Sequence, residues 1–139
     1  METKPRISGG CSCGAVRYVV NADPILMVNC HCRDCQRASG AAYAPIVVVP
    51  LSAVEMEGEL SYYKIVGDNG GVVERGFCPI CGSRVANRLG RLPEILGLMA
   101  GNLDDPTLHK PSMDLFTASA HPWDLLAPAT RKYERNLER

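Results

Sequence analysis

The sequence predicts a mainly β protein, and three observations support this prediction. Runs rich in β-branched residues recur along the chain, and some alternate in the way that a half-buried strand requires. Thirteen glycines and ten prolines interrupt the chain, which favours short strands and turns over long helices. Helix signals are weak. The 139 residues, 46% of them hydrophobic, are most simply one domain that spans residues 1–139.

The expected strands follow one another at hairpin spacing. Residues Ala15–Val20 show the alternation of a strand, and Ala42–Val49 is apolar enough to be a buried one. The turn signal Asp68-Asn69-Gly70 predicts a hairpin between strands at Leu60–Val66 and Gly71–Phe77. The other expected elements are strands at Arg84–Leu89, Glu94–Gly101 and Met113–Ser119, a short helix at Arg33–Ser39 and one helical turn that opens at Asp104–Pro106.

Charge and hydropathy exclude several classes of protein. Fifteen basic residues balance fifteen acidic ones, so the chain has no electrostatic footprint for non-specific nucleic-acid binding. The N-terminus lacks the apolar region of a signal peptide. The longest stretch without charge, Ala38–Val54, contains two prolines and is too short to span a bilayer. We expect a soluble cytoplasmic protein with no nucleic-acid or membrane partner.

The seven cysteines carry the strongest functional signal. Their number is odd and no export signal precedes them, which argues against a disulfide framework. All of them fall into short clusters: Cys11 and Cys13, then Cys30, Cys32 and Cys35, then Cys78 and Cys81. This clustering predicts metal binding, with zinc as the expected ion. An iron–sulfur cluster is the alternative, and visible absorbance would identify it.

Seven cysteines divide most sensibly into four and three, which predicts two zinc ions per chain. Two turns that each present two sulfurs would close a structural zinc site, formed by Cys11, Cys13, Cys78 and Cys81. The other three ligands, Cys30, Cys32 and Cys35, would leave one position open, as in a catalytic zinc site. A histidine at position 109 or 121 could instead close this second site and make it structural.

Three thiolates around a zinc dication carry a formal charge of minus one, so a soft substrate thiolate is the natural fourth ligand. Arg33 and Arg37 follow the cluster closely and could attract an anionic thiol, although they could equally be solvated helix residues. Gln36 and Ser39 are further candidates for substrate binding. His31 lies between two ligands, so in an extended segment its side chain would point away from the metal.

Four motifs give the chain a family resemblance. They are GGCxCGAVRY at Gly9–Tyr18, CHCxxCQRxSGA at Cys30–Ala41, FCxxCGS at Phe77–Ser83 and GNLDDP at Gly101–Pro106. Together with Pro122-Trp123, they resemble the glutathione-dependent formaldehyde-activating enzyme family, which includes centromere protein V.

The resemblance implies a β-tent fold of short antiparallel sheets and the same two zinc sites. It also implies a carbon–sulfur lyase activity, the reversible formation of S-hydroxymethylglutathione from glutathione and formaldehyde. His31 is our candidate for moving the hydroxyl proton. The C-terminal stretch departs from the family pattern, because Asp114, Ala120 and His121 replace histidine, lysine and alanine. The identity of the thiol, glutathione or a related one, therefore stays open.

Two other functions remain compatible with the sequence. Zinc-stapled hairpins could form a non-catalytic interaction module. The three-cysteine cluster could also act as a thiol or redox sensor that releases zinc when its sulfurs are oxidised.

Overall fold

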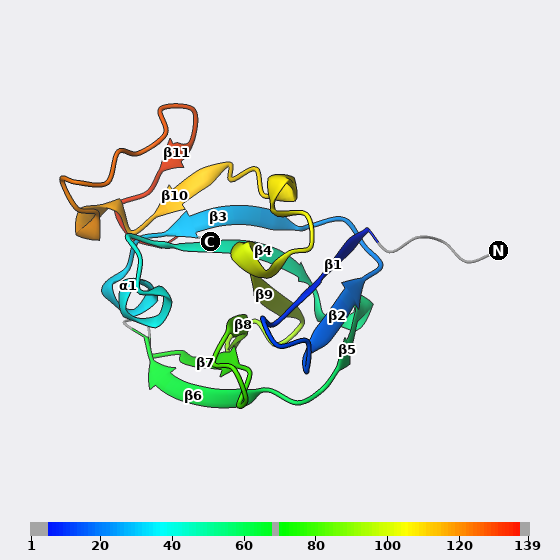
Figure 1. Ribbon diagram of the computed structural model, residues 1–139. Helices are drawn as coiled ribbons and strands as arrows, with labels where there is room; N and C mark the ends of the chain where they lie inside the picture. The colour runs from blue at the N-terminus through cyan, green and yellow to red at the C-terminus, as the bar shows by residue number, and fades with distance from the viewer. Residues whose placement is uncertain (1–5, 68–69, 137–139) are drawn as a thin grey trace.

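The computed structural model describes residues 6–67 and 70–136, which form eleven strands in two sheets and one short α-helix (Figure 1). A three-stranded sheet has the order β1 (Ile7–Gly10), β2 (Arg17–Val20), β5 (Val54–Glu57). An eight-stranded sheet has the order β11 (Arg131–Lys132), β10 (Met113–Leu115), β3 (Leu26–Cys30), β4 (Ala44–Pro50), β9 (Ile95–Met99), β8 (Arg84–Leu89), β7 (Val72–Phe77), β6 (Ser61–Val66). The prediction of a mainly β fold is confirmed.

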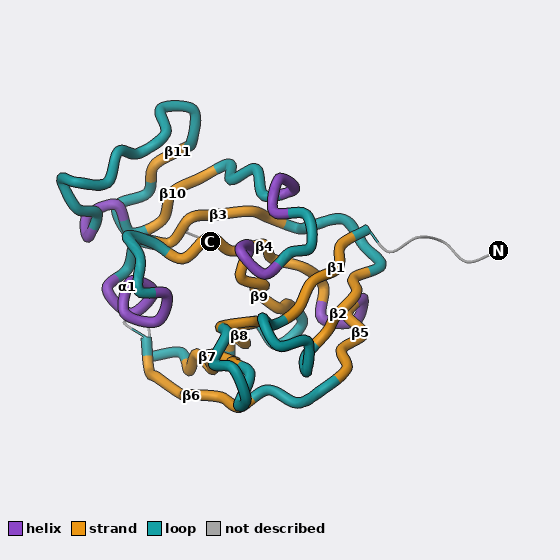
Figure 2. Tube along the Cα trace, in the orientation of Figure 1, coloured by secondary structure: helices purple, strands orange, loops and turns teal. Residues whose placement is uncertain are grey.

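The helix α1 (Arg33–Ser39) has the predicted bounds because both of its ends carry local stop signals. Cys32 caps its N-terminus, where its sulfur accepts a hydrogen bond from the Cys35 backbone N–H at 3.2 Å. Gly40 ends the helix in the left-handed conformation. As Figure 2 shows, the other helical segments are short, and they are 3-10 turns at Leu51–Ala53, Ala100–Asn102, Pro106–Leu108 and Thr117–Ser119. Within the described ranges, no helix has the length and apolar character needed to cross a membrane.

The larger sheet separates two hydrophobic cores, and β4 contributes to both. Val47 and Val49 point into the core between the two sheets, while Ala44 and Ile46 point to the opposite face. On that face they pack with Cys35 of α1. Figure 1 accordingly shows α1 and the three-stranded sheet on opposite sides of the molecule. This explains why β4 is almost wholly apolar, since a strand covered on both faces needs no polar side.

Some expected elements differ in length. The strand expected at Met113–Ser119 ends at Leu115, because Phe116 adopts a left-handed conformation with a φ of 56° and a 3-10 turn follows. The strand expected to reach Gly101 ends at Met99, where another 3-10 turn begins. The turn expected to open at Asp104–Pro106 is present, since a 3-10 turn capped by Asp105 spans Pro106–Leu108.

The sequence analysis did not predict four strands, β1, β3, β5 and β11. Two of them are weak as isolated strands, since β1 reads ISGG and β11 has two residues. The hairpin predicted around Asp68-Asn69-Gly70 joins β6 and β7, which pair antiparallel from Val66 and Val72 onward. Asp68 and Asn69 themselves lie outside the described residues.

The pairing of β10 with β3 places the C-terminal part of the chain beside the three-cysteine cluster. β10 lies parallel to β3, with Asp114 opposite Asn29 and Leu115 opposite Cys30. The His31 backbone N–H continues this pairing and donates to the Leu115 carbonyl at 2.9 Å. The C-terminal part of the chain is thereby held against the segment that carries the three-cysteine cluster.

Replacing Tyr18 with phenylalanine is expected to retain or increase stability. Tyr18 is buried between the sheets, and its hydroxyl has no hydrogen-bond partner among the described residues. An unsatisfied buried hydroxyl costs about 1–3 kcal/mol, which phenylalanine would recover. Urea unfolding of the two proteins measures the difference. A loss of more than about 1 kcal/mol in the variant would show that the hydroxyl makes a stabilising interaction.

Candidate metal centre

Two turns bring four cysteines together at the border of the core between the sheets, where Cys11 and Cys78 are buried and Cys13 and Cys81 are exposed. Cys11 and Cys13 lie in the turn after β1, and Cys78 and Cys81 lie in the turn after β7. All four sulfurs lie within 4.8 Å of one another, with Cys13 Sγ 3.6 Å from Cys11 Sγ and 3.8 Å from Cys78 Sγ. Sulfurs at the corners of a zinc tetrahedron with bonds of about 2.3 Å lie about 3.8 Å apart. The arrangement therefore fits one tetrahedral zinc ion closed by protein ligands.

The backbone of each turn favours this arrangement. Gly14 and Gly82 have φ angles of 82° and 78°, in the region that other residues rarely adopt. Cys78 donates its N–H to the Ser83 carbonyl and its carbonyl accepts from Gly82, which closes the turn. The sulfurs of Cys11 and Cys78 also accept backbone N–H groups, as thiolate ligands commonly do.

Ser83 joins the two turns and was not predicted as a functional residue. Its hydroxyl accepts the Ser12 backbone N–H at 3.0 Å and lies 3.2 Å from Cys81 Sγ. This contact, together with the backbone N–H groups of Ser83 and Cys13, lowers the pKa of Cys81 to about 5, which favours the thiolate that a metal ion needs. The motif Cys-Gly-Ser contained the signal, since a serine two residues after a ligand can reach its sulfur.

A second group of sulfurs lies on the other face of the larger sheet. Cys30 ends β3, Cys32 caps α1 and Cys35 lies in its first turn. Their three sulfurs lie within 4.8 Å of one another, which fits a shared metal ion. Cys30 and Cys35 are buried, whereas Cys32 is partly exposed. A ligand from solvent would therefore approach from the side of Cys32.

The histidines that could have closed this second group have other partners. His109 Nε2 lies 3.0 Å from the side-chain oxygen of Asn29, and His121 Nε2 lies 2.6 Å from that of Gln36. Among the residues that the structure describes, the group of ligand atoms contains three sulfurs and no histidine nitrogen or carboxylate. The described residues thus offer three of the four donors that zinc requires.

The side chains of the three cysteines differ in their pKa values. Hydrogen bonds from the Cys30 and Cys35 thiols lower the pKa of Cys32. Contacts with Cys32 and Cys35, together with burial, raise the pKa of Cys30. The sulfurs therefore favour a single thiolate when no cation is bound, and a dication is needed to hold all three in the ionised form.

Arg75 is the functional candidate that the sequence analysis missed. It lies in β7, is only 6% exposed and points its Nη2 at Cys35 Sγ over 3.7 Å. Its positive charge favours the thiolate form of both Cys35 and Cys32. The sequence offers little signal for this role, because Arg75 follows Glu74 in β7 and nothing nearby says which sulfur it meets.

His31 is completely buried and lies between two carboxylates. Its Nε2 lies 2.8 Å from Asp114 Oδ1, and its Nδ1 lies 3.2 Å from Asp124 Oδ2 without hydrogen-bond geometry. Asp114 also accepts hydrogen bonds from Thr130 and Lys132. Burial alone would raise the pKa of Asp114, but the bonds from Thr130, His31 and Lys132 outweigh it and lower that pKa. The residue that departs from the family pattern is therefore the partner of His31.

The four predicted substrate-binding residues all lie on α1, but they differ in their exposure to solvent and in the hydrogen bonds that they already make. Gln36 is buried and donates to the carbonyls of His31 and Ser119. Ser39 caps the end of the helix through the Tyr43 carbonyl and the Ala41 N–H. Arg33 and Arg37 are exposed, and Arg33 also hydrogen-bonds to Gln36 and approaches His121. These two arginines present positive charge to solvent on α1, beside the exposed carboxylate of Asp34.

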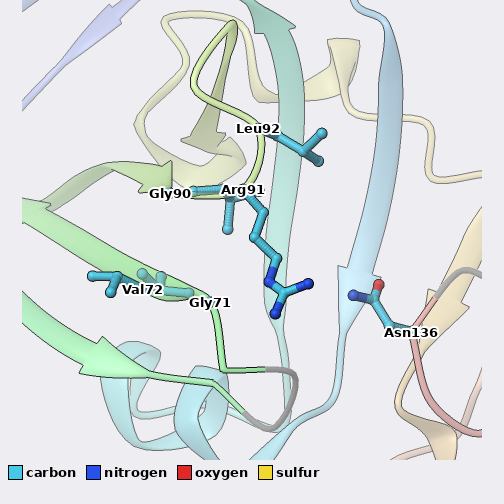
Figure 3. A pocket seen from close by; sticks show the side chains of 8 residues that line it. Gly71, Val72, Gly90, Arg91, Leu92 and Asn136 are labelled. Atoms are coloured by element: carbon cyan, nitrogen blue, oxygen red, sulfur yellow. The ribbon is translucent and has the colours of Figure 1, made fainter.

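Two cavities in the described part of the protein lie away from the sulfurs. One of about 80 Å³ lies between the start of β7 and the β8–β9 turn, where Figure 3 shows the Arg91 side chain extending toward Asn136. Another of about 210 Å³ is lined by apolar residues such as Met27 and Leu108. Both are smaller than a typical ligand pocket of about 300–1,000 Å³. We therefore look for the functional site at the clusters and not at these cavities.

The fold and the two clusters together define a mainly β protein with two groups of sulfurs fit to hold metal ions. The family described as glutathione-dependent formaldehyde-activating enzyme matches residues 6–119, so the chain belongs to this family. A crystal structure of a protein from Rhodobacter sphaeroides is similar in fold, with a TM-score of 0.58 and 24% identity over 75% of this chain and 96% of that one. No curated protein matches the chain.

Proposed function

We propose that the protein is a zinc-dependent carbon–sulfur lyase that forms and cleaves a thiol adduct of the S-hydroxymethylglutathione type. In the forming direction, the thiol sulfur attacks the carbonyl carbon of formaldehyde and a carbon–sulfur bond forms. The thiol proton ends on the new hydroxyl oxygen, so atoms and charges balance. Membership of the formaldehyde-activating family supports the reaction class. We further propose that the protein acts on a small-molecule thiol.

The observation that carries this proposal is the group formed by Cys30, Cys32 and Cys35, which has no fourth protein ligand among the described residues. Zinc held there would supply an open Lewis-acid position at which a thiol loses its proton near neutral pH. The four-cysteine group supports the complementary role of a structural site, because it provides all four ligands by itself.

The surrounding residues would bind and orient the substrate. Arg33 and Arg37 lie one helical turn apart on α1, so their charges are neighbours on the helix surface. They would attract the carboxylates of a thiol such as glutathione. Gln36 would fix the cysteine segment, since its amide holds the His31 carbonyl and the Ser119 carbonyl together. The role of His31 in proton transfer stays a prediction, and its buried position also supports a role in holding this segment.

Replacing Cys32 with alanine is expected to abolish turnover and leave the fold intact. Cys32 is the most exposed of the three sulfurs and is not part of the core between the sheets. The loss should be on the order of 1,000-fold or more, because a Lewis acid supplies several kcal/mol of charge stabilisation. Exchange between free formaldehyde and its glutathione adduct, followed by NMR, measures turnover.

Zinc analysis and circular dichroism complete this experiment. The wild type should contain two zinc ions per chain, and Cys32→Ala should retain one ion and the β-sheet spectrum. The matched control is Asp34→Asn, a change at an exposed residue of the same helix, which should keep full turnover. Full turnover in Cys32→Ala would exclude the proposed catalytic site.

A further inference from the structure

Arg75 occupies a position that its charge makes unfavourable unless an anion lies close to it. It is one of the few buried charged side chains among the described residues, and it lies in β7, beside the edge strand β6 of the larger sheet. An arginine keeps its proton inside proteins, so it cannot lower the free-energy cost of burial by becoming neutral. No described carboxylate lies within ion-pair distance of Arg75, and its contact with a charged or ionisable group is the one with Cys35 Sγ at 3.7 Å.

A second buried polar group lies beside it. Asn87 of β8 is the direct cross-strand partner of Arg75, so both side chains lie on the face of the sheet that carries α1. The Asn87 side-chain amide points at Met99 Sδ over 3.8 Å, and thioether sulfur is a weak acceptor. Met99 in turn packs with Cys30 and Cys35. Two buried polar side chains, Arg75 and Asn87, therefore donate toward sulfur atoms within an otherwise hydrophobic cluster.

The charges at this site then limit what the fourth ligand can be. Three thiolates and a zinc dication sum to minus one, and a thiolate as fourth ligand would bring the sum to minus two. In a buried site of low dielectric, an uncompensated second negative charge is strongly unfavourable. A neutral ligand leaves the sum at minus one. The guanidinium of Arg75 would thus stabilise an anionic fourth ligand much more than a neutral one.

We propose that Arg75 is the specificity-determining residue of the three-cysteine site. Its guanidinium holds Cys35 in place and favours an anionic sulfur over a neutral ligand at the fourth position of the metal ion. This inference deepens the proposed function and rests on it for the identity of the metal. It assigns the preference for a thiolate to a buried charge in β7 that contacts Cys35. The exposed arginines of α1 would instead recognise the distant carboxylates of the substrate.

The inference is tested by ligand binding to the cobalt-loaded protein. Co²⁺ takes the same cysteine ligands as zinc and absorbs visible light, so a thiolate that binds to it changes the charge-transfer bands. The probes are 2-mercaptoethanol, which becomes anionic only at its sulfur, and imidazole, which binds as a neutral ligand. We expect Arg75→Met to weaken 2-mercaptoethanol binding by about 10–100-fold, as changes around a metal centre commonly do. The affinity for imidazole should stay within about threefold of the wild-type value, because a neutral ligand gains little from the charge of Arg75.

Two further variants separate charge from packing. Arg75→Lys retains the charge, so it should recover most of the thiol affinity even if its geometry differs. Arg88→Met is the matched control, because Arg88 lies on the neighbouring strand, is exposed and stacks on Tyr62 at 5.1 Å. It should bind both probes as the wild type does. Equal weakening of both probes in Arg75→Met, or no weakening of either, would overturn the inference.

The outcomes also separate this inference from the lyase proposal. Thiol binding that depends on Arg75 in a protein without turnover would refute the lyase and retain the role of Arg75. Normal turnover in the wild type, with thiol binding that Arg75→Met does not weaken, would retain the lyase proposal and refute the role of Arg75. A wild-type protein whose cobalt bands do not respond to thiols would refute both.

Discussion

Replacing Cys78 with serine is expected to unfold much of the protein under conditions where the wild type is fully folded. Cys78 is completely buried in the core between the sheets and is one of four sulfurs that tie two turns together. The two turns are separated by more than sixty residues, as the sequence difference of 65 between Cys13 and Cys78 shows. Loss of a structural metal site belongs to the changes that cost more than about 4 kcal/mol, a large part of the total stability of a small domain.

Urea unfolding followed by circular dichroism measures this loss, and zinc analysis shows whether the ion has left. The control is Cys32→Ala, which removes a sulfur from the other cluster and should keep most of the stability. A zinc chelator should reproduce the effect of Cys78→Ser on the wild type. An unfolding midpoint equal to that of the wild type in Cys78→Ser would show that the four sulfurs do not hold a structural ion.

Replacing Asp114 with asparagine is expected to lower the free energy of unfolding by about 3–5 kcal/mol, the range measured when one partner of a buried ion pair is removed. Asp114 is the acceptor for His31, Thr130 and Lys132, and His31 is completely buried. Without the carboxylate, the donors that face it lose their anionic partner. The damage should concentrate where β10 joins β3, close to the three-cysteine cluster.

The same carboxylate predicts a dependence of stability on pH. Because the pKa of Asp114 in the folded protein is lowered from 3.8, the ionised carboxylate contributes stability above about pH 4. That contribution is lost as the pH falls through the lowered pKa. The wild type should therefore lose stability below pH 4 more steeply than Asp114→Asn does.

Thermal unfolding between pH 3 and pH 7 measures both effects. Asp23→Asn is the matched control, because Asp23 forms an exposed ion pair with Arg6 and such pairs contribute about 1 kcal/mol or less. An Asp114→Asn protein as stable as this control, with the pH dependence of the wild type, would contradict the role of Asp114 as the centre of a buried network.

The features that the sequence predicted correctly depend on residues that are close to one another in the chain. The bounds of α1 followed from its neighbours in sequence, and the division of seven cysteines into four and three matches the two groups of sulfurs. Short motifs such as Cys-Pro-Ile-Cys-Gly fix their own turn geometry, because Gly82 permits the conformation that the turn needs. The mainly β class followed for the same reason, since turn residues and β-branched runs act over a few positions.

Partners that are distant in sequence could not be predicted in this way. Nothing near Arg75 in the sequence indicates that it meets Cys35, 40 residues earlier. The contact between His31 and Asp114 spans 83 residues and depends on the parallel pairing of β10 with β3. Strand order and register are decided by packing over the whole sheet, and a shift of one residue would turn Asp114 to the other face.

By itself, therefore, the sequence identified two groups of cysteines whose spacing suits a metal ion, in a β-rich chain of the formaldehyde-activating family. The tertiary structure alone decided what surrounds those sulfurs. It buried His31 between two carboxylates, brought Arg75 to Cys35 and left His109 and His121 outside the cluster. The physical reason is that ligand spacing is a local property of the backbone, whereas the electrostatic surroundings of a site depend on the register of strands far apart in the chain.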